Sequence, residues 1–255
     1  MKIICAKIKP IIQVLSLSFI ALVMVVIVSI TSTEGLYFGY AANKLVPIYS
    51  VETTEKKVAL TFDAAWGSDK TLSIVNILKE ADIEGTFFLV GFWTEQNADK
   101  VKQIDEAGFD IGTHSNTHPK MSGLTKTQIE SELKLSMNLI TDITGKQVKY
   151  FRPPFGDYNN TLISTADELG LKTIQWDVDT LDWKGISEHE ILSRIKASVK
   201  NGSIILCHNN SDHIVEALPT IINYIKQEGY KMVKLSDLVY EKNYIVNNNG
   251  IQKLK

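Results

Sequence analysis

The sequence predicts an α/β fold, an irregular (β/α)7 barrel preceded by one N-terminal transmembrane helix. Strand-like and helical patterns alternate without a break from Lys57 onward, which is typical of repeated βα units. The chain has 255 residues and 44% hydrophobic side chains, enough for one barrel of about 250 residues with a single core. An open doubly wound sheet is the alternative, although no glycine-rich nucleotide loop follows the first strand.

An uncharged segment of 20 residues, 11–30, follows the basic residues Lys2, Lys7 and Lys9. A helix of this length crosses about 30 Å of hydrocarbon. Because basic flanks stay in the cytoplasm, we expect the rest of the chain to lie outside it, anchored to the membrane. The alternative is a cleaved signal peptide, for which Tyr40-Ala-Ala42 is a weak cleavage candidate.

Polarity divides the chain into a cytoplasmic basic flank (1–10), a transmembrane signal-anchor (11–30), a stalk or linker (31–56), a folded domain (57–240) and a C-terminal tail (241–255). The tail contains Asn247-Asn-Asn-Gly250 and is expected to be loose. The net charge of −2 and the scattered lysines give no argument for binding to nucleic acid, and we expect no such partner.

Seven apolar runs predict buried parallel strands, near 58–63, 86–90, 110–113, 149–152, 173–177, 203–207 and 231–235. Five polar side chains capable of chemistry stand at the ends of these runs: Asp63, His114, Arg152, Asp177 and His208. Parallel sheets and barrels carry their active sites at the carboxyl ends of their strands. The sequence therefore predicts an enzyme with its site at this edge.

Capping residues mark helices between the strands. Thr125 with Gln128 and Ser187 with Glu190 have the spacing of capping boxes, each ahead of an apolar stripe. Gly145 is the expected C-cap of the first of these helices.

The densest polar motif is His114-Ser-Asn-Thr-His118-Pro119, in which two imidazoles four residues apart can meet one metal ion. Taken alone, His118 is better explained as a loop contact and His208 as a strand-end histidine bonded to backbone; only together with the other motifs do they favour a site. His189 and His213 belong to no motif and are expected at the surface.

Five motifs together resemble the polysaccharide deacetylases with a NodB-homology domain, carbohydrate esterase family 4. They are Thr61-Phe-Asp63, His114-Ser-Asn-Thr-His118-Pro, Arg152-Pro-Pro-Phe-Gly156, Asp179-Thr-Leu-Asp-Trp183 and Leu206-Cys-His208, spread over Lys57 to Leu238 in the family's order. With the N-terminal anchor and the form Thr-Phe-Asp-Ala-Ala-Trp-Gly67, the chain looks most like the sporulation-associated, membrane-anchored branch of spore-forming Gram-positive bacteria. The resemblance covers the whole predicted domain.

The resemblance implies a divalent metal, zinc or else cobalt or nickel, with His114 and His118 as protein ligands. It implies that Asp63 is the general base acting on water and that Arg152 holds its carboxylate in place. His208 would be the general acid that protonates the leaving nitrogen. Such a metal polarises the amide carbonyl and lowers the pKa of a bound water.

Four further residues receive roles from the resemblance. Asp182 would orient His208 and raise its pKa, which keeps the imidazole protonated near neutral pH. The Phe155 amide would point at the developing oxyanion, while Trp183 and Leu206 would line a small groove for the acetyl group.

One position departs from the family pattern. The family usually has a second aspartate directly after the first, where it completes an Asp-His-His metal site, but this chain has Ala64. Two imidazoles with waters still bind a metal, although more weakly. Asp63 or Asp69 would be the substitute third ligand, and an Asp63 engaged by the metal would no longer be free to act as base.

Two functions follow from these residues. The first is a metal-dependent hydrolase that removes acetyl groups from N-acetylated amino sugars of peptidoglycan, in the bacterial cell wall or spore envelope. The second is a catalytically impaired pseudoenzyme that binds glycan, motivated by Ala64. Hydrolysis of a small N-acyl or ureide substrate is a third, weaker alternative. The sequence does not distinguish N-acetylglucosamine from N-acetylmuramic acid.

Overall fold

The computed structural model describes residue 16 and residues 18–25 and 44–255. Residues 18–25 are helical. Most of the predicted basic flank, signal-anchor and stalk lies outside the described residues, including 11–15, 17 and 26–30 of the predicted transmembrane segment. Among the residues that are described, no helix has both the length and the apolar character needed to cross a bilayer.

Residues 45–255 form one compact unit built on an eight-stranded sheet whose paired strands all run parallel. Its order is β6 (Lys172–Thr173), β5 (Tyr150–Phe151), β4 (Asp110–Thr113), β3 (Thr86–Leu89), β2 (Lys57–Ala64), β8 (Ile204–His208) and β7 (Val178–Asp179), with β9 (Lys231–Met232) paired to the start of β2. This strand order is the one expected when successive βα units lie side by side and the sheet curves into a half-barrel.

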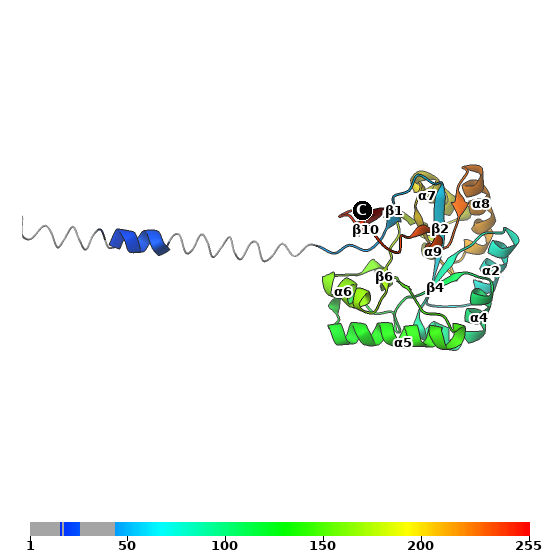
Figure 1. Ribbon diagram of the computed structural model, residues 1–255. Coiled ribbons are helices and arrows are strands. Elements are labelled where there is room, and N and C mark those ends of the chain that lie inside the picture. Colours follow the sequence, from blue (N-terminus) through cyan, green and yellow to red (C-terminus); the bar gives the residue numbers. More distant parts are fainter. Residues whose placement is uncertain (1–15, 17, 26–43) are drawn as a thin grey trace, which may run out of the picture. The chain divides into compact units, whose positions relative to one another are not determined.

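The longer helices follow the strand order on one side of this sheet (Figure 1). They are α6 (Asn160–Glu168), α5 (Lys126–Thr144), α4 (Ala98–Glu106), α2 (Thr71–Glu80), α8 (Ile214–Gln227) and α7 (Glu188–Ser198), and each packs against the next. A short α3 (Gly91–Gln96) lies against α5, and α9 (Leu235–Leu238) packs on β2. A doubly wound sheet would carry long helices on both faces, so the half-barrel, and not that alternative, is observed.

Side-chain alternation along β2 explains how the sheet separates its two faces. Leu60 and Phe62 belong to the apolar cluster that the helices cover, whereas Ala59 belongs to a second, inner cluster. Successive residues of a strand point to opposite faces. Asp63 therefore shares the inner face with Ala59, and Ala64 packs with the outer cluster.

The predicted helix caps are confirmed. The Thr125 hydroxyl accepts from the backbone N–H of Gln128, and the Gln128 side chain accepts from the Thr125 N–H in return. Ser187 and Glu190 form the same reciprocal pair. Gly145 ends α5 in the left-handed conformation, with φ of 70°.

The predicted strand 173–177 is wrong: only Thr173 belongs to a named strand, β6, and the residues after it lead to β7 at the opposite end of the strand order. The chain between them crosses the inner face, where Gln175 N–H donates to the Ile48 carbonyl. Asp177 consequently lies beside the amino end of β8, where it accepts from Ile204 N–H and Ser203 Oγ. Hydrophobic periodicity cannot distinguish one strand from two short ones joined by a crossing.

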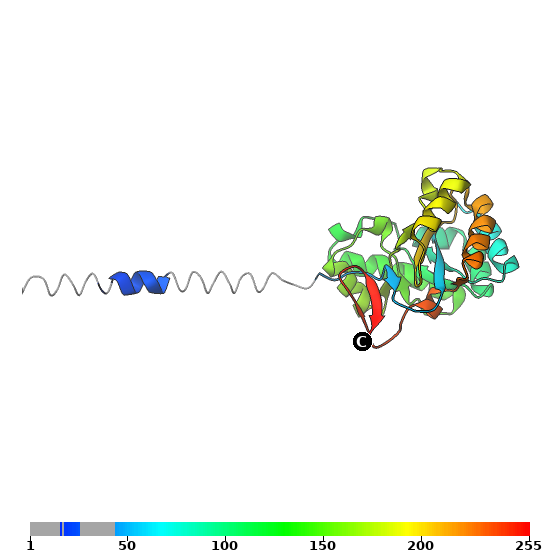
Figure 2. The ribbon, with the colours of Figure 1, turned by 90° about the horizontal axis from the view of Figure 1, so that it is seen from above.

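Both ends of the predicted domain also need correction. Folded structure begins at Leu45 and not at Lys57, and β1 (Ser50–Val51) pairs with the supposedly loose tail. That tail forms β10 (Tyr244–Val246) and β11 (Ile251–Leu254), the C-terminal strands shown in red in Figure 2. The fully buried Gln252 side chain fastens them to Tyr240 with two hydrogen bonds. Pairing with a distant segment orders a tail whose own sequence is polar.

Candidate active site

Strand register brings four of the five predicted strand-end residues to one edge. Asp63 and His208 are paired positions on β2 and β8. Thr113 pairs with Phe151, so His114 and Arg152 follow at the same level of β4 and β5. The fifth, Asp177, lies at the opposite edge, as described above. Parallel strands place their carboxyl ends together, and this is the edge at which parallel α/β folds carry chemistry.

Asp63 and Arg152 form a buried ion pair. Arg152 Nη1 donates to Asp63 Oδ1 over 2.7 Å, and Nη2 donates to the Gln175 carbonyl over 3.1 Å. The guanidinium lies over the Phe88 ring, 4.2 Å from its centroid. Burial raises the pKa of Asp63, but Arg152 and the neighbouring histidines outweigh it and hold the pKa below its ordinary value. Asp63 is therefore a carboxylate at neutral pH.

His114 and His118 face each other through their Nε2 atoms, which lie 3.2 Å apart. His114 Nδ1 is 2.7 Å from the Arg152 carbonyl oxygen. Because a carbonyl only accepts, Nδ1 must carry the proton, which leaves the Nε2 lone pair of His114 directed toward His118. Asp63 Oδ2 lies 3.5 Å from the same Nε2 atom.

Both imidazoles are neutral near pH 7. Burial lowers the pKa of His118 to about 4, with a further contribution from His114. Burial also lowers the pKa of His114, although Asp63 opposes this shift. Metal binding requires deprotonated ligands, and two neutral imidazoles with converging Nε2 atoms suit a divalent ion such as zinc.

Among the described residues, no side chain supplies the third protein ligand that an Asp-His-His metal site would have. Ala64 is fully buried at the end of β2, and Asp69 is exposed in the loop before α2. Within residues 44–255, no three His, Cys, Asp or Glu side chains are arranged to hold a metal. His114 and His118 are therefore the two protein side chains that fit a metal ion at this site.

Helix α5 holds the loop that carries these histidines. Glu132 Oε2 accepts from the backbone N–H groups of Asn116 and Thr117 at 2.9 and 2.8 Å, and Oε1 accepts from the Thr117 hydroxyl at 2.7 Å. The loop is strained, since Ser115 and His118 have positive φ values of 69° and 59°. The Glu132 contacts compensate this strain and fix His118 against His114.

His208 and the fully buried Asp182 form the second charged pair of the site. His208 Nδ1 lies 2.8 Å from Asp182 Oδ1, and Asp182 Oδ2 accepts from His208 N–H and from the Ser211 hydroxyl, each at 2.8 Å. Burial lowers the pKa of His208, but the hydrogen bond and charge of Asp182 outweigh it, and the net pKa is raised. The imidazole therefore keeps its proton to a higher pH than a free histidine.

Exposed aromatic side chains surround the histidines. Trp66 and Phe155 each contact the His118 ring edge-on, with centroids 4.6 Å apart. Trp66, Phe155 and Trp183 are 63%, 61% and 58% exposed. Leu206, predicted to line the groove, is buried on β8.

The sequence alone did not point to Glu132, Gln175 or Ser211. Each of the three forms hydrogen bonds with a predicted site residue or with the loop that carries one. None of them stands at the end of an apolar run. A polar residue on the sheet-facing side of a predicted helix was the one signal available for Glu132. His189 and His213 are exposed, as predicted.

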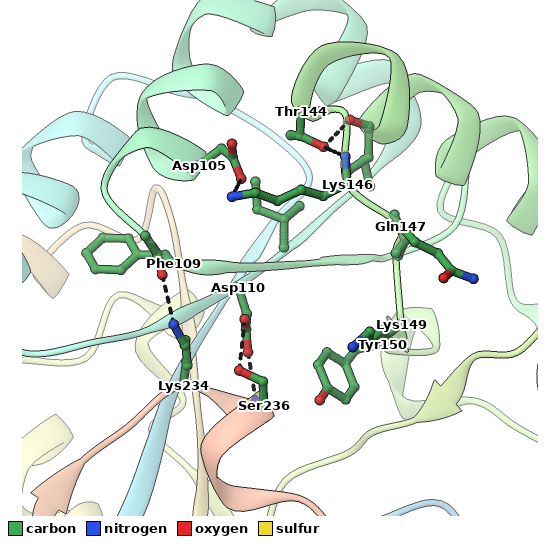
Figure 3. Close-up of a pocket in the computed structure, with 14 residues that line it drawn as sticks. Asp105, Phe109, Asp110, Thr144, Lys146, Gln147, Lys149, Tyr150, Lys234 and Ser236 are labelled. Atoms are coloured by element: carbon green, nitrogen blue, oxygen red, sulfur yellow. Dashed lines mark hydrogen bonds and ion pairs between the residues drawn. The ribbon is translucent and has the colours of Figure 1, made fainter. Parts of the chain in front are cut away.

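A cavity of about 410 Å³ lies at the opposite end of the sheet, beside the amino ends of β4 and β5 (Figure 3). Two contacts cross its lining: Lys146 pairs with Asp105, and Asp110 accepts from Ser236. Because the cavity lies beside the amino ends of the strands, away from His114 and His208 at the carboxyl edge, it does not belong to the candidate site.

A family model described as polysaccharide deacetylase matches residues 50–174. The peptidoglycan-N-acetylmuramic acid deacetylase PdaA of Bacillus subtilis is 32% identical over 80% of this chain and 81% of its own length. The peptidoglycan-N-acetylglucosamine deacetylase PgdA of Listeria monocytogenes is 32% identical over 77% of this chain. The chain spans 42% of that longer protein.

Among solved structures, a carbohydrate esterase family 4 pseudoenzyme from Bacillus anthracis has a TM-score of 0.74 and 34% identity, over 82% of this chain and 73% of its own. A mutant of that pseudoenzyme has restored enzymatic activity. The chain is thus similar both to active deacetylases and to a protein that has lost activity.

Proposed function

Because this chain belongs to the polysaccharide deacetylase family, we propose that it hydrolyses the acetyl amide of N-acetylated amino sugars in peptidoglycan. The observation that carries the proposal is the pairing of Asp63 with His208 across β2 and β8. One is a carboxylate held by Arg152, and the other is an imidazole whose pKa is raised by the hydrogen bond and charge of Asp182. A carboxylate that can accept a proton and an imidazole that holds one to higher pH, on adjacent strands, suit amide hydrolysis.

His114 and His118 would hold a divalent ion, with zinc the best match to imidazole ligands. When bound, the ion would polarise the acetyl carbonyl and lower the pKa of water toward 7. Asp63 accepts the proton of the attacking water, since Arg152 occupies Oδ1 and leaves Oδ2 toward His114. The departing sugar nitrogen takes its proton from His208.

The loop that contains Phe155 supports the developing negative charge. Phe155 adopts a left-handed conformation, with φ of 60°, between two prolines and Gly156. We assign its backbone N–H to the oxyanion of the tetrahedral intermediate. Removal of one such donor costs about 2.7–4 kcal/mol in other hydrolases.

Acetate release and metal content, measured on one sample, test the proposal. Residues 45–255 form a compact unit, but the full chain in detergent is the safer material. It is incubated with N-acetylated peptidoglycan fragments and with zinc, cobalt or nickel. Acetate release that a chelator abolishes and zinc restores is expected; folded, metal-loaded protein that releases none rejects the hydrolase.

The second candidate is a glycan-binding protein without turnover. Ala64 stands where the family usually has a metal-binding aspartate, and the similar Bacillus anthracis protein is a pseudoenzyme. Glycan binding with no acetate release at any supplied metal supports this candidate. Loss of binding after removal of the Trp183 ring would place the glycan beside Asp182 and His208.

We further propose that residues 11–30 anchor the chain in the membrane with residues 45–255 outside the cytoplasm, in a spore-forming bacterium. The uncharged segment after three lysines motivates this, and peptidoglycan is accessible from that side. Protease digestion of intact protoplasts tests it: fragments from the folded unit support the proposal, and complete protection contradicts it.

A further inference from the structure

Trp66 is a large aromatic side chain that remains exposed while the rest of its loop is fixed. Its exposed fraction is 63%, whereas Trp93, in contact with the same loop, is 2% exposed. A single exposed hydrophobic residue is ordinary, so exposure by itself decides nothing. Two features distinguish Trp66: side chains from other elements bind the backbone of the next residue, and its ring contacts His118.

The loop after β2 is held by buried side chains from two other elements. The Gly67 carbonyl accepts from Trp93 Nε1 at 2.6 Å and from Asn209 Nδ2 at 3.0 Å. Gly67 has φ of +66°, and a Cβ there would lie 2.1 Å from Asn210 Nδ2, so only glycine fits. The backbone directly after Trp66 is consequently held by these contacts, at a residue that cannot be replaced without displacing Asn210.

The indole borders the site directly. Its ring lies edge-on to His118 at 4.6 Å and tilted toward Phe92 at 6.2 Å. The Phe155 ring contacts the His118 ring at the same distance. Two exposed aromatic side chains, Trp66 and Phe155, thus lie directly against the imidazole of His118.

We propose that Trp66 is a sugar-binding residue, whose indole receives the apolar face of a pyranose ring of the glycan. This inference rests on the proposed function, because it assigns a contact for the same substrate. A pyranose has one face of C–H groups and a rim of hydroxyls. An exposed indole matches it with a flat apolar surface and an N–H donor. Because the backbone beside Trp66 is already held by hydrogen bonds, binding needs to order little of this loop.

Binding of a β-linked N-acetylglucosamine tetramer tests the assignment without requiring turnover. Isothermal titration calorimetry compares full-length wild type with Trp66→Ala, Trp66→Phe and the control Leu135→Ala. Leu135 is also a large exposed side chain, at 50%, but it lies on α5. We expect Trp66→Ala to raise Kd about tenfold, which is the effect of losing one aromatic contact. Trp66→Phe should recover most of the affinity, and Leu135→Ala should match wild type.

Zinc titration of the same variants separates a sugar contact from an effect through His118. Unchanged zinc affinity in Trp66→Ala together with weakened glycan binding supports the inference. Equal Kd in Trp66→Ala and wild type overturns it, as does a parallel loss of zinc affinity. Wild type that binds the tetramer but releases no acetate rejects the proposed hydrolysis alone, and wild type that binds no tetramer rejects both.

Discussion

Asp63 divides its two carboxylate oxygens between Arg152 and the histidine pair. Oδ1 lies 2.7 Å from Arg152 Nη1, and Oδ2 lies 3.5 Å from His114 Nε2. The same carboxylate is therefore fixed on one side and faces the reaction centre on the other. The oxygen that faces His114 is the atom for which the sequence left two roles open, base or metal ligand.

Asp63→Asn should abolish turnover and preserve metal binding. An amide keeps the shape and can still accept from Arg152, but it cannot take a proton; loss of a general base typically costs 10²–10⁴-fold in rate. Acetate release and zinc titration on the same preparation check this. Asp105→Asn, at the remote cavity, is the control. A matching loss of zinc affinity would make Asp63 a ligand.

Glu132→Ala should weaken zinc binding although Glu132 is not a ligand. Its carboxylate holds the strained loop that carries His118, and loss of such a supporting contact typically costs 10–100-fold in metal affinity. Glu130→Ala is the matched control on the same helix, because Glu130 pairs with Lys134 on the surface. Equal zinc affinity in both variants would show that the loop keeps its shape without Glu132.

Asp182→Asn should move the alkaline limit of activity to lower pH. The raised pKa of His208 means that the protonated acid, and the stability from its pairing, are fully present below about pH 6.5. Both are lost as the pH rises through the raised folded-state pKa. Without the Asp182 charge that pKa falls. The pH dependence of kcat/KM checks the shift, and an unchanged alkaline limb would remove His208 from the role of acid.

Ala64→Asp should raise zinc affinity and reduce the stability of the metal-free protein. The new carboxylate would supply the acidic ligand of the usual Asp-His-His set, but it enters a fully buried position packed with apolar side chains. Zinc titration and urea unfolding, each with and without zinc, measure the two effects. Ala64→Asn controls for size, since it adds similar volume without a charge. Identical zinc affinity in both variants would contradict a third-ligand role.

Gln252→Ala should lower the free energy of unfolding by about 1–3 kcal/mol, the cost of unsatisfied buried polar groups. The side chain is fully buried and bonds both the N–H and the carbonyl of Tyr240. Urea denaturation measures the change against Gln227→Ala, at the exposed end of α8. Equal stability would mean that the C-terminal strands contribute little to the folded unit.

The sequence by itself determined the alternation of strands and helices, the capping boxes at Thr125 and Ser187, and four of the residues at the active edge. These features are local, because the spacing of apolar residues, the capping residues and the strand ends are each encoded by a few neighbouring positions. The parallel register then brings Asp63, His114, Arg152 and His208 together without further information.

Only the tertiary structure decided what depends on contacts between distant segments. Asp177 lies outside the predicted site because residues 174–177 cross the inner face between β6 and β7. The polar tail became ordered because it pairs with β1, and Glu132 became part of the histidine loop across a gap of 15 or 16 residues. The physical reason is common to all three: a hydrogen bond to a remote backbone leaves no periodic trace in either partner's sequence.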